Sequence, residues 1–150
     1  MQPTRLEECL REVLELVGLP DGIKLNIDLP ASLPLALADR QQLSIVFSNL
    51  IRNARDAMPE GGSLAIRGRH RAGFIEIDVE DSGMGIHPDN LGKIMEPLFS
   101  TKARGIGLGL PIARAILEKH RGRLTVTSQP CHGTKFTVEL LAASNSLSDK

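Results

Sequence analysis

Near its middle, the sequence places an aspartate and two glycines directly after a segment of alternating apolar residues. Residues 74–80 have the period-two pattern of a β-strand, and Asp81, Gly83 and Gly85 follow as D-x-G-x-G. A carboxylate at the end of a strand can accept hydrogen bonds from an exocyclic amine, and glycine lets the backbone turn and approach a ligand. An ordinary Asp/Gly turn explains the same residues, so this motif alone leaves both interpretations open.

A second group of polar residues has helical spacing. Asn49, Asn53 and Asp56 stand at i, i+4 and i+7 within the segment Arg40–Met58, which puts them along one line of a helix. Asparagine is a poor residue for a helix interior, because its side chain competes for backbone hydrogen bonds. The line is therefore either a solvated polar edge or a set of oxygen ligands for a polar ligand or a hard cation.

A glycine-rich run forms a third segment that can meet a ligand. Residues 105–110 read G-x-G-x-G-x and lead into the helical pattern of residues 111–119, which Arg121-Gly122 closes. A glycine-rich turn that opens a helix offers bare N–H groups to phosphate. The spacing is not G-x-G-x-x-G, and no strand precedes it, which argues against a dinucleotide site. The sequence also lacks the G-x-x-x-x-G-K-[ST] of a P-loop.

The elements that position these groups follow from the same periodicities. Leu6–Val17 has helical spacing and ends at Gly18, and residues 23–29 alternate as a strand with one exposed face. Leu35–Ala38 is a short second strand.

The long helix predicted over Arg40–Met58 begins with a capping-box-like pair. Asp39 is the expected N-cap, and Gln42 stands three residues later. The predicted buried stripe of this helix consists of Leu43, Val46, Phe47, Leu50, Ala54 and Ala57.

Two antiparallel hairpins complete the pattern. Ser63–Arg71 and Phe74–Glu80 are strands joined by a tight turn at Ala72-Gly73, and Leu124–Ser128 and Thr134–Leu140 alternate as a second pair. The long stretch between the hairpins, up to the glycine-rich run, has few apolar residues in register. Such a stretch is typical of a functional lid or of disorder.

Composition excludes several classes of function. The chain has 150 residues and a formal net charge of zero, so no global field favours nucleic acid or an anionic membrane. It has no apolar run of transmembrane length, and Trp and Tyr are absent, which leaves few aromatic rings to stack on bases. Cys9 and Cys131 lack metal-ligand spacing and are expected to be reduced small hydrophobes of a cytosolic protein. The four histidines, expected at the surface, are His70, His87, His120 and His132.

In their order along the chain, these segments resemble the sequence boxes of two-component sensor histidine kinases. The matching segments are Asn49–Ala57 (N box), Asp81–Ile86 (G1 box), Glu96–Lys102 (F box) and Gly105–Leu110 (G2 box). Gly133-Thr134 with Phe136 is similar to the closing strand of that family. Each box alone is a weak signal, and the resemblance rests on all four together.

The resemblance implies a Bergerat-type ATP-binding fold, which DNA gyrase, mismatch-repair ATPases and the large heat-shock chaperones share. This is an α/β two-layer sandwich, with a mixed, largely antiparallel sheet and helices on one face. Residues 1–20 are then an N-terminal helix near the junction to a dimerisation domain, residues 21–141 the ATP-binding domain, and residues 142–150 a flexible tail.

Roles for individual residues follow from the same resemblance. Asp81 accepts a hydrogen bond from the adenine amino group, Gly83 and Gly85 leave room for the base, and Thr134 steadies Asp81.

The phosphate side of the site is implied in the same way. Asn53 ligates a Mg²⁺ ion that bridges the phosphates, with Asn49 beside it, and Lys102 approaches the γ-phosphate from the lid. These three are the expected catalytic residues. The other implied ATP contacts are Asp56, Ile86, Arg104, Gly105, Ile106, Gly107, Leu108, Gly109 and Leu110.

One position favours phosphoryl transfer over hydrolysis. Gyrase-like ATPases normally carry a glutamate at the place of Asn49, where it polarises the attacking water, and asparagine cannot take that proton. Asp56 departs from the usual pattern, because a carboxylate near a triphosphate is repelled unless Arg52, Arg55 or the metal offsets its charge.

No segment resembles the box that carries the phospho-accepting histidine. The resemblance therefore implies a catalytic piece of a longer kinase in the cytoplasm, joined near Leu6–Val17 to a dimerisation domain that supplies the histidine. A response-regulator receiver domain is the expected downstream partner, with no direct contact to nucleic acid or membrane. Two alternatives stay open: an anti-sigma-type serine kinase of the same fold, and a regulatory module that binds nucleotide without transfer.

Overall fold

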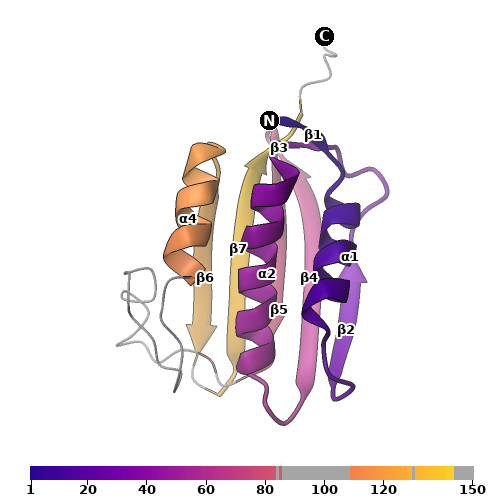
Figure 1. Ribbon diagram of the computed structural model, residues 1–150, viewed down its shortest axis with the longest axis vertical. Helices are drawn as coiled ribbons and strands as arrows, with labels where there is room; N and C mark the ends of the chain where they lie inside the picture. The colour runs from indigo at the N-terminus through magenta and orange to yellow at the C-terminus, as the bar shows by residue number, and fades with distance from the viewer. Residues whose placement is uncertain (84, 86–108, 130, 144–150) are drawn as a thin grey trace.

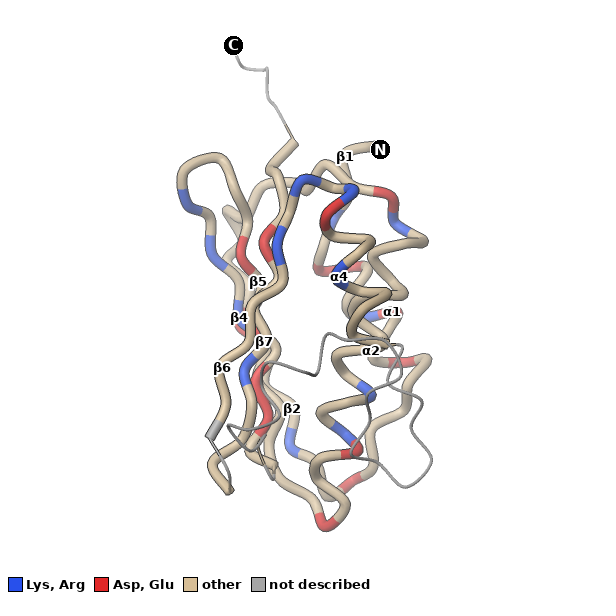
Figure 2. Tube along the Cα trace, turned by 90° about the vertical axis from the view of Figure 1, so that its left-hand side faces the viewer, with Lys and Arg blue, Asp and Glu red and all other residues tan. Residues whose placement is uncertain are grey.

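The chain folds into two layers, a five-stranded sheet and a layer of helices that covers one face of it (Figure 1, Figure 2). The computed structural model describes residues 1–83, 85, 109–129 and 131–143. The prediction of an α/β sandwich, with a mixed, largely antiparallel sheet and helices on one face, is confirmed.

The strands of the main sheet lie in the order β2-β4-β5-β7-β6. Their bounds are Ile23–Asp28 for β2, Gly62–Arg71 for β4, Phe74–Asp81 for β5, Arg123–Gln129 for β6 and Gly133–Leu141 for β7. β2 is parallel to β4 and the other neighbours are antiparallel, which confirms both predicted hairpins. A second, two-stranded sheet pairs β1 (Gln2–Thr4) with β3 (Ala36–Ala38). β3 agrees with the sequence prediction, whereas β1 is too short to give a periodic signal.

The helices of the described residues lie across the sheet in the order α1, α2, α4 (Figure 1). Their bounds are Leu6–Val17 for α1, Arg40–Asp56 for α2 and Gly109–Lys119 for α4. Within the described part of the chain, none of them combines the length and apolar character needed to cross a bilayer.

The predicted ends of α1 and α2 are largely confirmed. The Asp39 carboxylate accepts a hydrogen bond from the Gln42 N–H at 3.2 Å, which satisfies one of the unpaired donors at the start of α2. Gly18 ends α1 in the left-handed conformation and donates its N–H to the Leu14 carbonyl at 3.0 Å. α2 ends two residues before Met58, the end that the sequence predicts.

Two turns depend on unusual backbone conformations. Ala72 and Gly73 have φ of 51° and 85°, as expected for the tight turn between β4 and β5. At the end of α4 the left-handed residue is Arg121, with φ of 59°, and not the glycine after it. Gly122 is needed for packing, because a Cβ there would lie 2.0 Å from the Glu139 carbonyl oxygen.

The hydrophobic core lies between the sheet and the helices. The buried side chains of α2 are Leu43, Val46, Phe47, Ser48, Leu50, Ile51 and Ala54. Ala57, predicted to be in the stripe, is only half-buried, and Met58 is buried instead. α1 joins the same core through Leu6, Cys9, Leu10 and Val13. Ile75, Ile77 and Val79 of β5 supply the core from the sheet.

The two cysteines differ in their surroundings. Cys9 is buried, as expected for a small hydrophobe, and its Sγ lies 3.6 Å from the Ser44 hydroxyl. Burial raises the pKa of the Cys9 thiol above its ordinary value, so the thiol stays protonated. Cys131 is also free, but it is exposed in the turn before β7 and does not pack as a small hydrophobe of the core.

One histidine also departs from the sequence prediction. His70 and His132 are exposed as expected, and His87 lies outside the described residues. His120 is only 1% exposed, so the prediction that it lies at the surface is wrong. It directly follows α4, where its ring continues the apolar side of the helix into the core.

A buried carboxylate lies on the face of the sheet that the helices leave open. Asp78 is 3% exposed and accepts hydrogen bonds from Arg69 Nη1 at 2.8 Å and from the Thr137 hydroxyl at 2.7 Å. Burial alone would raise the pKa of Asp78, but these hydrogen bonds and the charges of Arg69 and Lys135 outweigh it. The pKa of Asp78 therefore lies below its ordinary value.

Replacing Asp78 by Asn is expected to lower the free energy of unfolding at pH 7 by about 2 kcal/mol, because Arg69 loses a charged partner. Since the pKa is lowered in the folded state, the contribution is present above the ordinary aspartate pKa and is lost as the pH falls through the lowered value. Urea unfolding at pH 7 and pH 3 should therefore show a smaller difference at pH 3. Glu7→Gln, in an exposed pair with Arg11, is the control and should change little at either pH. A difference of equal size at both pH values would contradict this account.

Candidate functional site

The polar motifs of the sequence meet at one end of the two-layer structure. β5 and α2 end there, and α4 begins beside the middle of α2 and runs away from that end (Figure 1). Side-chain and backbone contacts tie these elements together at Asp81, Asn49 and Gly109. The predicted site residues that fall within the described structure are Asn49, Asn53, Asp56, Asp81, Gly83, Gly85, Gly109, Leu110 and Thr134. Those outside the described residues are Ile86, Lys102, Arg104, Gly105, Ile106, Gly107 and Leu108.

Asp81 is the last residue of β5 and is 6% exposed. Period-two alternation places its side chain on the helix-covered face, with Ile77 and Val79. Its carboxylate accepts a hydrogen bond from the Gly83 N–H at 2.8 Å and another from the Thr134 backbone N–H. The expected support from Thr134 thus comes from its backbone.

Burial raises the pKa of the Asp81 carboxyl, and the charge of Glu80 adds to this effect. The two backbone hydrogen bonds act in the opposite direction without cancelling the burial, so the pKa lies above its ordinary value. Both donors are neutral N–H groups. Ionised Asp81 is therefore a poorly solvated acceptor, which a further donor from a ligand would stabilise.

Glycine stands at three positions around Asp81, for a different structural reason at each. A Cβ on Gly83 would lie 2.4 Å from the Ala57 carbonyl oxygen, so this glycine lets the turn after β5 pack against the end of α2. The sequence interpretation instead assigned Gly83 to making room for a base. Gly85 has φ of 74°, a conformation that favours glycine. Gly133, with φ of 98°, passes so close that a Cβ would lie 2.0 Å from the Asp81 carbonyl oxygen.

The polar line on α2 faces the start of α4. Asn49 and Asn53 are half-buried, and Asn49 Nδ2 donates a hydrogen bond to the Gly109 carbonyl at 3.1 Å. This bond fixes the orientation of the Asn49 amide and leaves its oxygen as an acceptor. Asp56 is exposed, and its carboxylate pairs with Arg55 at 3.3 Å. Arg55 thus places a positive charge beside the Asp56 carboxylate.

The sequence gives weak signals for some residues that shape this end. The Ser82 hydroxyl accepts a hydrogen bond from the Ser63 N–H at 2.9 Å, which holds the turn after β5 against the start of β4. Its role was not predicted, because it depends on a partner nineteen residues away. For the close approach of Gly133 to the Asp81 carbonyl, the available sequence signal was a glycine directly before a predicted strand.

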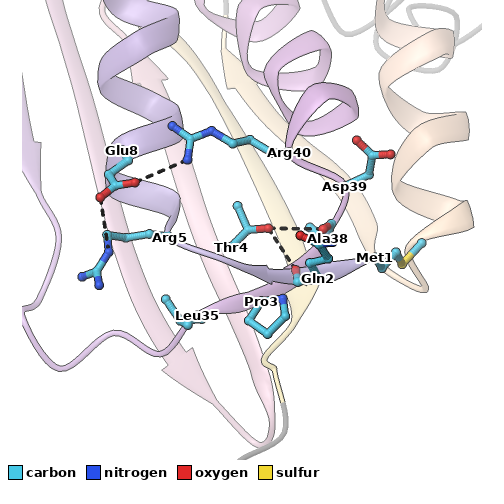
Figure 3. Close-up of a pocket in the computed structure, with 10 residues that line it drawn as sticks. All are labelled: Met1, Gln2, Pro3, Thr4, Arg5, Glu8, Leu35, Ala38, Asp39 and Arg40. Carbon is cyan, nitrogen blue, oxygen red and sulfur yellow. Dashed lines mark hydrogen bonds and ion pairs between the residues drawn. The ribbon is translucent and has the colours of Figure 1, made fainter.

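A cavity of about 560 Å³ lies at the opposite end of the molecule, beside β1 and β3 (Figure 1, Figure 3). The residues that line it are Met1, Gln2, Pro3, Thr4, Arg5, Glu8, Leu35, Ala38, Asp39 and Arg40. Glu8 bridges Arg5 and Arg40 in this cavity, and the Thr4 hydroxyl donates to the Ala38 carbonyl at 3.2 Å. None of the predicted site residues lines this cavity, so it is separate from the candidate site.

Residues 38–144 match the family model of histidine kinase-, DNA gyrase B- and HSP90-like ATPases. The chain belongs to this family. It is a homologue of the catalytic ATPase domain of sensor histidine kinases, which confirms the resemblance of the four sequence boxes. The family membership agrees with the two-layer fold and with the aspartate at the end of β5.

Relatives of this histidine kinase-like ATPase agree in sequence and in structure. The sensory histidine kinase/phosphatase NtrB of Escherichia coli O157:H7 is 38% identical over 91% of this chain, and the chain spans 44% of the length of that relative. The mycobacterial sensor histidine kinase MprB has a TM-score of 0.84 at 27% identity, covering 94% of this chain and 97% of that chain. Full-length ShkA, in complex with AMPPNP, has a TM-score of 0.79 at 27% identity and covers 95% of this chain and 31% of that chain.

Replacing Gly83 by Ala in this ATPase domain is expected to lower the free energy of unfolding by about 2 kcal/mol, since the new Cβ overlaps the Ala57 carbonyl. Gly22→Ala is the matched control, because a Cβ there meets its nearest atom at 3.5 Å. The control should change stability by less than about 1 kcal/mol. Urea unfolding measures both variants, and equal effects would show that packing against α2 does not select the glycine.

Proposed function

We propose that this chain binds Mg-ATP and transfers the γ-phosphoryl group to a histidine on a separate dimerisation domain. The observation that carries the proposal is the buried carboxylate of Asp81, held by two neutral N–H groups beside a line of amide side chains. Family membership supports ATP binding, and the phosphoryl acceptor is inferred from the histidine kinase relatives.

Asp81 is the proposed adenine contact. The exocyclic amine of adenine is a neutral donor, and the site offers it a carboxylate oxygen with raised pKa. The free energy lost in burying the ionised carboxylate is partly recovered when the amine donates to it. AMPPNP, which ShkA binds, carries the same adenine group as ATP.

The amides of α2 are the proposed phosphate-side groups. The half-buried Asn53 offers a neutral amide oxygen, a type of ligand that Mg²⁺ accepts together with phosphate oxygens and water. Asn53 would therefore hold the ion, which would supply charge neutralisation on the phosphates. Asn49 holds the start of α4 through Gly109. Contacts to ATP from Gly85, Ile86, Lys102, Arg104 and the glycine-rich run stay predictions.

The chemistry of Asn49 favours transfer over hydrolysis. An amide cannot take a proton from water, and its NH₂ group is engaged with the Gly109 carbonyl. The γ-phosphoryl group is then kept for another nucleophile, and transfer relies on positioning and charge neutralisation.

The acceptor histidine is proposed to come from another domain. His120, the one buried histidine among the described residues, has both ring nitrogens engaged within the fold. The chain spans 44% of the related NtrB, which leaves room for the dimerisation domain that we propose as partner. We place the junction near α1 and the reaction in the cytoplasm. A receiver domain of a response regulator is the proposed next acceptor.

Replacing Asp81 by Asn is expected to weaken ATP binding at least tenfold, because adenine loses its acceptor. The free energy of unfolding at pH 7 should change by less than about 1 kcal/mol, since relief from burying a charge offsets one lost hydrogen bond. Isothermal titration with ATP and Mg²⁺, alongside urea unfolding, measures both quantities. Glu80→Gln, one residue away on the open face, is the control and should bind ATP like wild type. Wild-type affinity in the Asp81 variant would refute the adenine contact.

Mixing the chain with ATP, Mg²⁺ and a dimerisation domain of a related kinase is expected to label that domain. Phosphohistidine is acid-labile and phosphoserine is not, so loss of label in acid identifies the acceptor class. A His→Gln change of the acceptor in the supplied domain is the control and should remove the label. Asn53→Ala should reduce transfer at least tenfold if the amide holds the metal. Acid-stable label would indicate a serine kinase, and tight ATP binding without label would indicate a regulatory module.

A further inference from the structure

His120 is only 1% exposed, and the proposed reaction does not use this buried side chain. Its Nε2 accepts a hydrogen bond from the Asp39 backbone N–H at 3.0 Å, and its Nδ1 lies 2.8 Å from the Ile116 carbonyl oxygen. The backbone N–H can only donate, so Nε2 carries no proton. Nδ1 therefore carries the proton and donates to Ile116. The ring is a fully bonded bridge from the end of α4 to the N-cap of α2.

A second bridge joins the start of α4 to the middle of α2. Asn49 Nδ2 donates to the carbonyl of Gly109, the first residue of α4. α2 and α4 run in opposite directions, so the end of α4 lies beside the start of α2, and the start of α4 lies beside the middle of α2 (Figure 1). Asp39 and Asn49 are ten residues apart, and Gly109 and His120 are eleven apart. At 1.5 Å per residue, both separations are about 15 to 17 Å along the helix axis. Both hydrogen bonds can therefore form at the same relative position of the two helices.

α2 and α4 also share buried apolar side chains. Ala113, Ile116 and Leu117 of α4 are buried in the same core as Phe47 and Leu50 of α2. Apolar packing is non-directional and changes little when one helix slides by a fraction of a turn. A slide would leave the Asp39 N–H or the imidazole nitrogen buried without a partner, which is costly. The polar bridges, rather than the apolar contact, thus select the register.

We infer that His120 is a positioning residue: it fixes how far α4 lies along α2, and so sets the start of α4 against the amide line of α2. The inference rests on the proposed function, because that end of α4 is where the phosphates are expected. Asp81 lies on β5 and does not depend on this register. Loss of the bridge should therefore weaken binding of the phosphate-bearing nucleotide and leave adenosine binding almost unchanged.

His120→Gln and His120→Leu form the test pair. The glutamine carbonyl can accept the Asp39 N–H in place of Nε2, whereas leucine fills the space without an acceptor. Isothermal titration should show Mg-ATP binding about tenfold weaker in the leucine variant and within about threefold of wild type in the glutamine variant. Adenosine binding, followed by NMR titration, should stay within about twofold in both. Equal losses for ATP and adenosine, or no loss with leucine, would overturn the inference.

The position of α4 along α2 can also be measured without nucleotide. Spin labels are attached at Gln41→Cys on α2 and Ile112→Cys on α4, two exposed positions, in a chain whose own cysteines are replaced by serine. The distance between the two labels then reports the relative position of the helices. In the leucine variant the mean label distance should shift by about 1.5 Å, one residue rise, and glutamine should restore it. An unchanged distance in the leucine variant would refute the register role whether or not the chain binds ATP.

A second pair of variants tests the same hydrogen bond from the α2 side, and it decides the question where the leucine variant does not fold. Asp39→Ala removes the cap of α2 but keeps its backbone donor, whereas Asp39→Pro removes both. The proline variant should reproduce the shift in label distance and the selective loss of ATP binding, and the alanine variant should not. Identical behaviour of the two variants would contradict the inference.

Discussion

The arrangement of this end of the molecule depends on one buried carboxylate. Asp81 lies at the covered face of the sheet, where burial raises the pKa of its carboxyl and two backbone N–H groups donate hydrogen bonds to it. One donor belongs to the turn after β5 and the other to the start of β7, so the carboxylate holds two segments that are far apart in sequence. Its supporting glycines, Gly83 and Gly133, are needed because these segments approach within contact of α2 and of Asp81 itself.

The helix layer then brings polar groups to the same end. α2 packs its apolar stripe on the sheet and turns its amide line toward α4, where Asn49 meets Gly109. His120 joins the end of α4 to the start of α2. An apolar core alone would leave the relative position of the two helices loosely defined, whereas directional hydrogen bonds at both ends of α4 define it. The geometry of the site is therefore maintained partly by a residue at the far end of the helix pair.

Periodicity predicted most of this fold, because α1, α2, α4 and both hairpins are long enough to show their repeat. β1 was missed, since three residues carry no period. His120 was misplaced at the surface because a histidine gives no apolar signal, although it follows Ala113, Ile116 and Leu117 at helical spacing. The packing of Gly83 against Ala57 was not predicted, because this contact joins two elements and no local pattern contains it. Predicted site residues on the lid stay predictions.

Two aspartates of one strand illustrate how the fold separates stability from binding. Asp78 and Asp81 are three residues apart on β5, and a period of two puts them on opposite faces. Asp78 is matched by the charge of Arg69, which lowers the pKa of Asp78 and makes it part of the structure. Among the described residues, the hydrogen-bond donors to Asp81 are neutral N–H groups, and burial raises the pKa of Asp81. A carboxylate that is already neutralised has little left to gain from a ligand, whereas one that is buried and only partly satisfied has much to gain. The alternation of the strand thus places the ion-paired aspartate on the open face and the proposed adenine contact on the covered face.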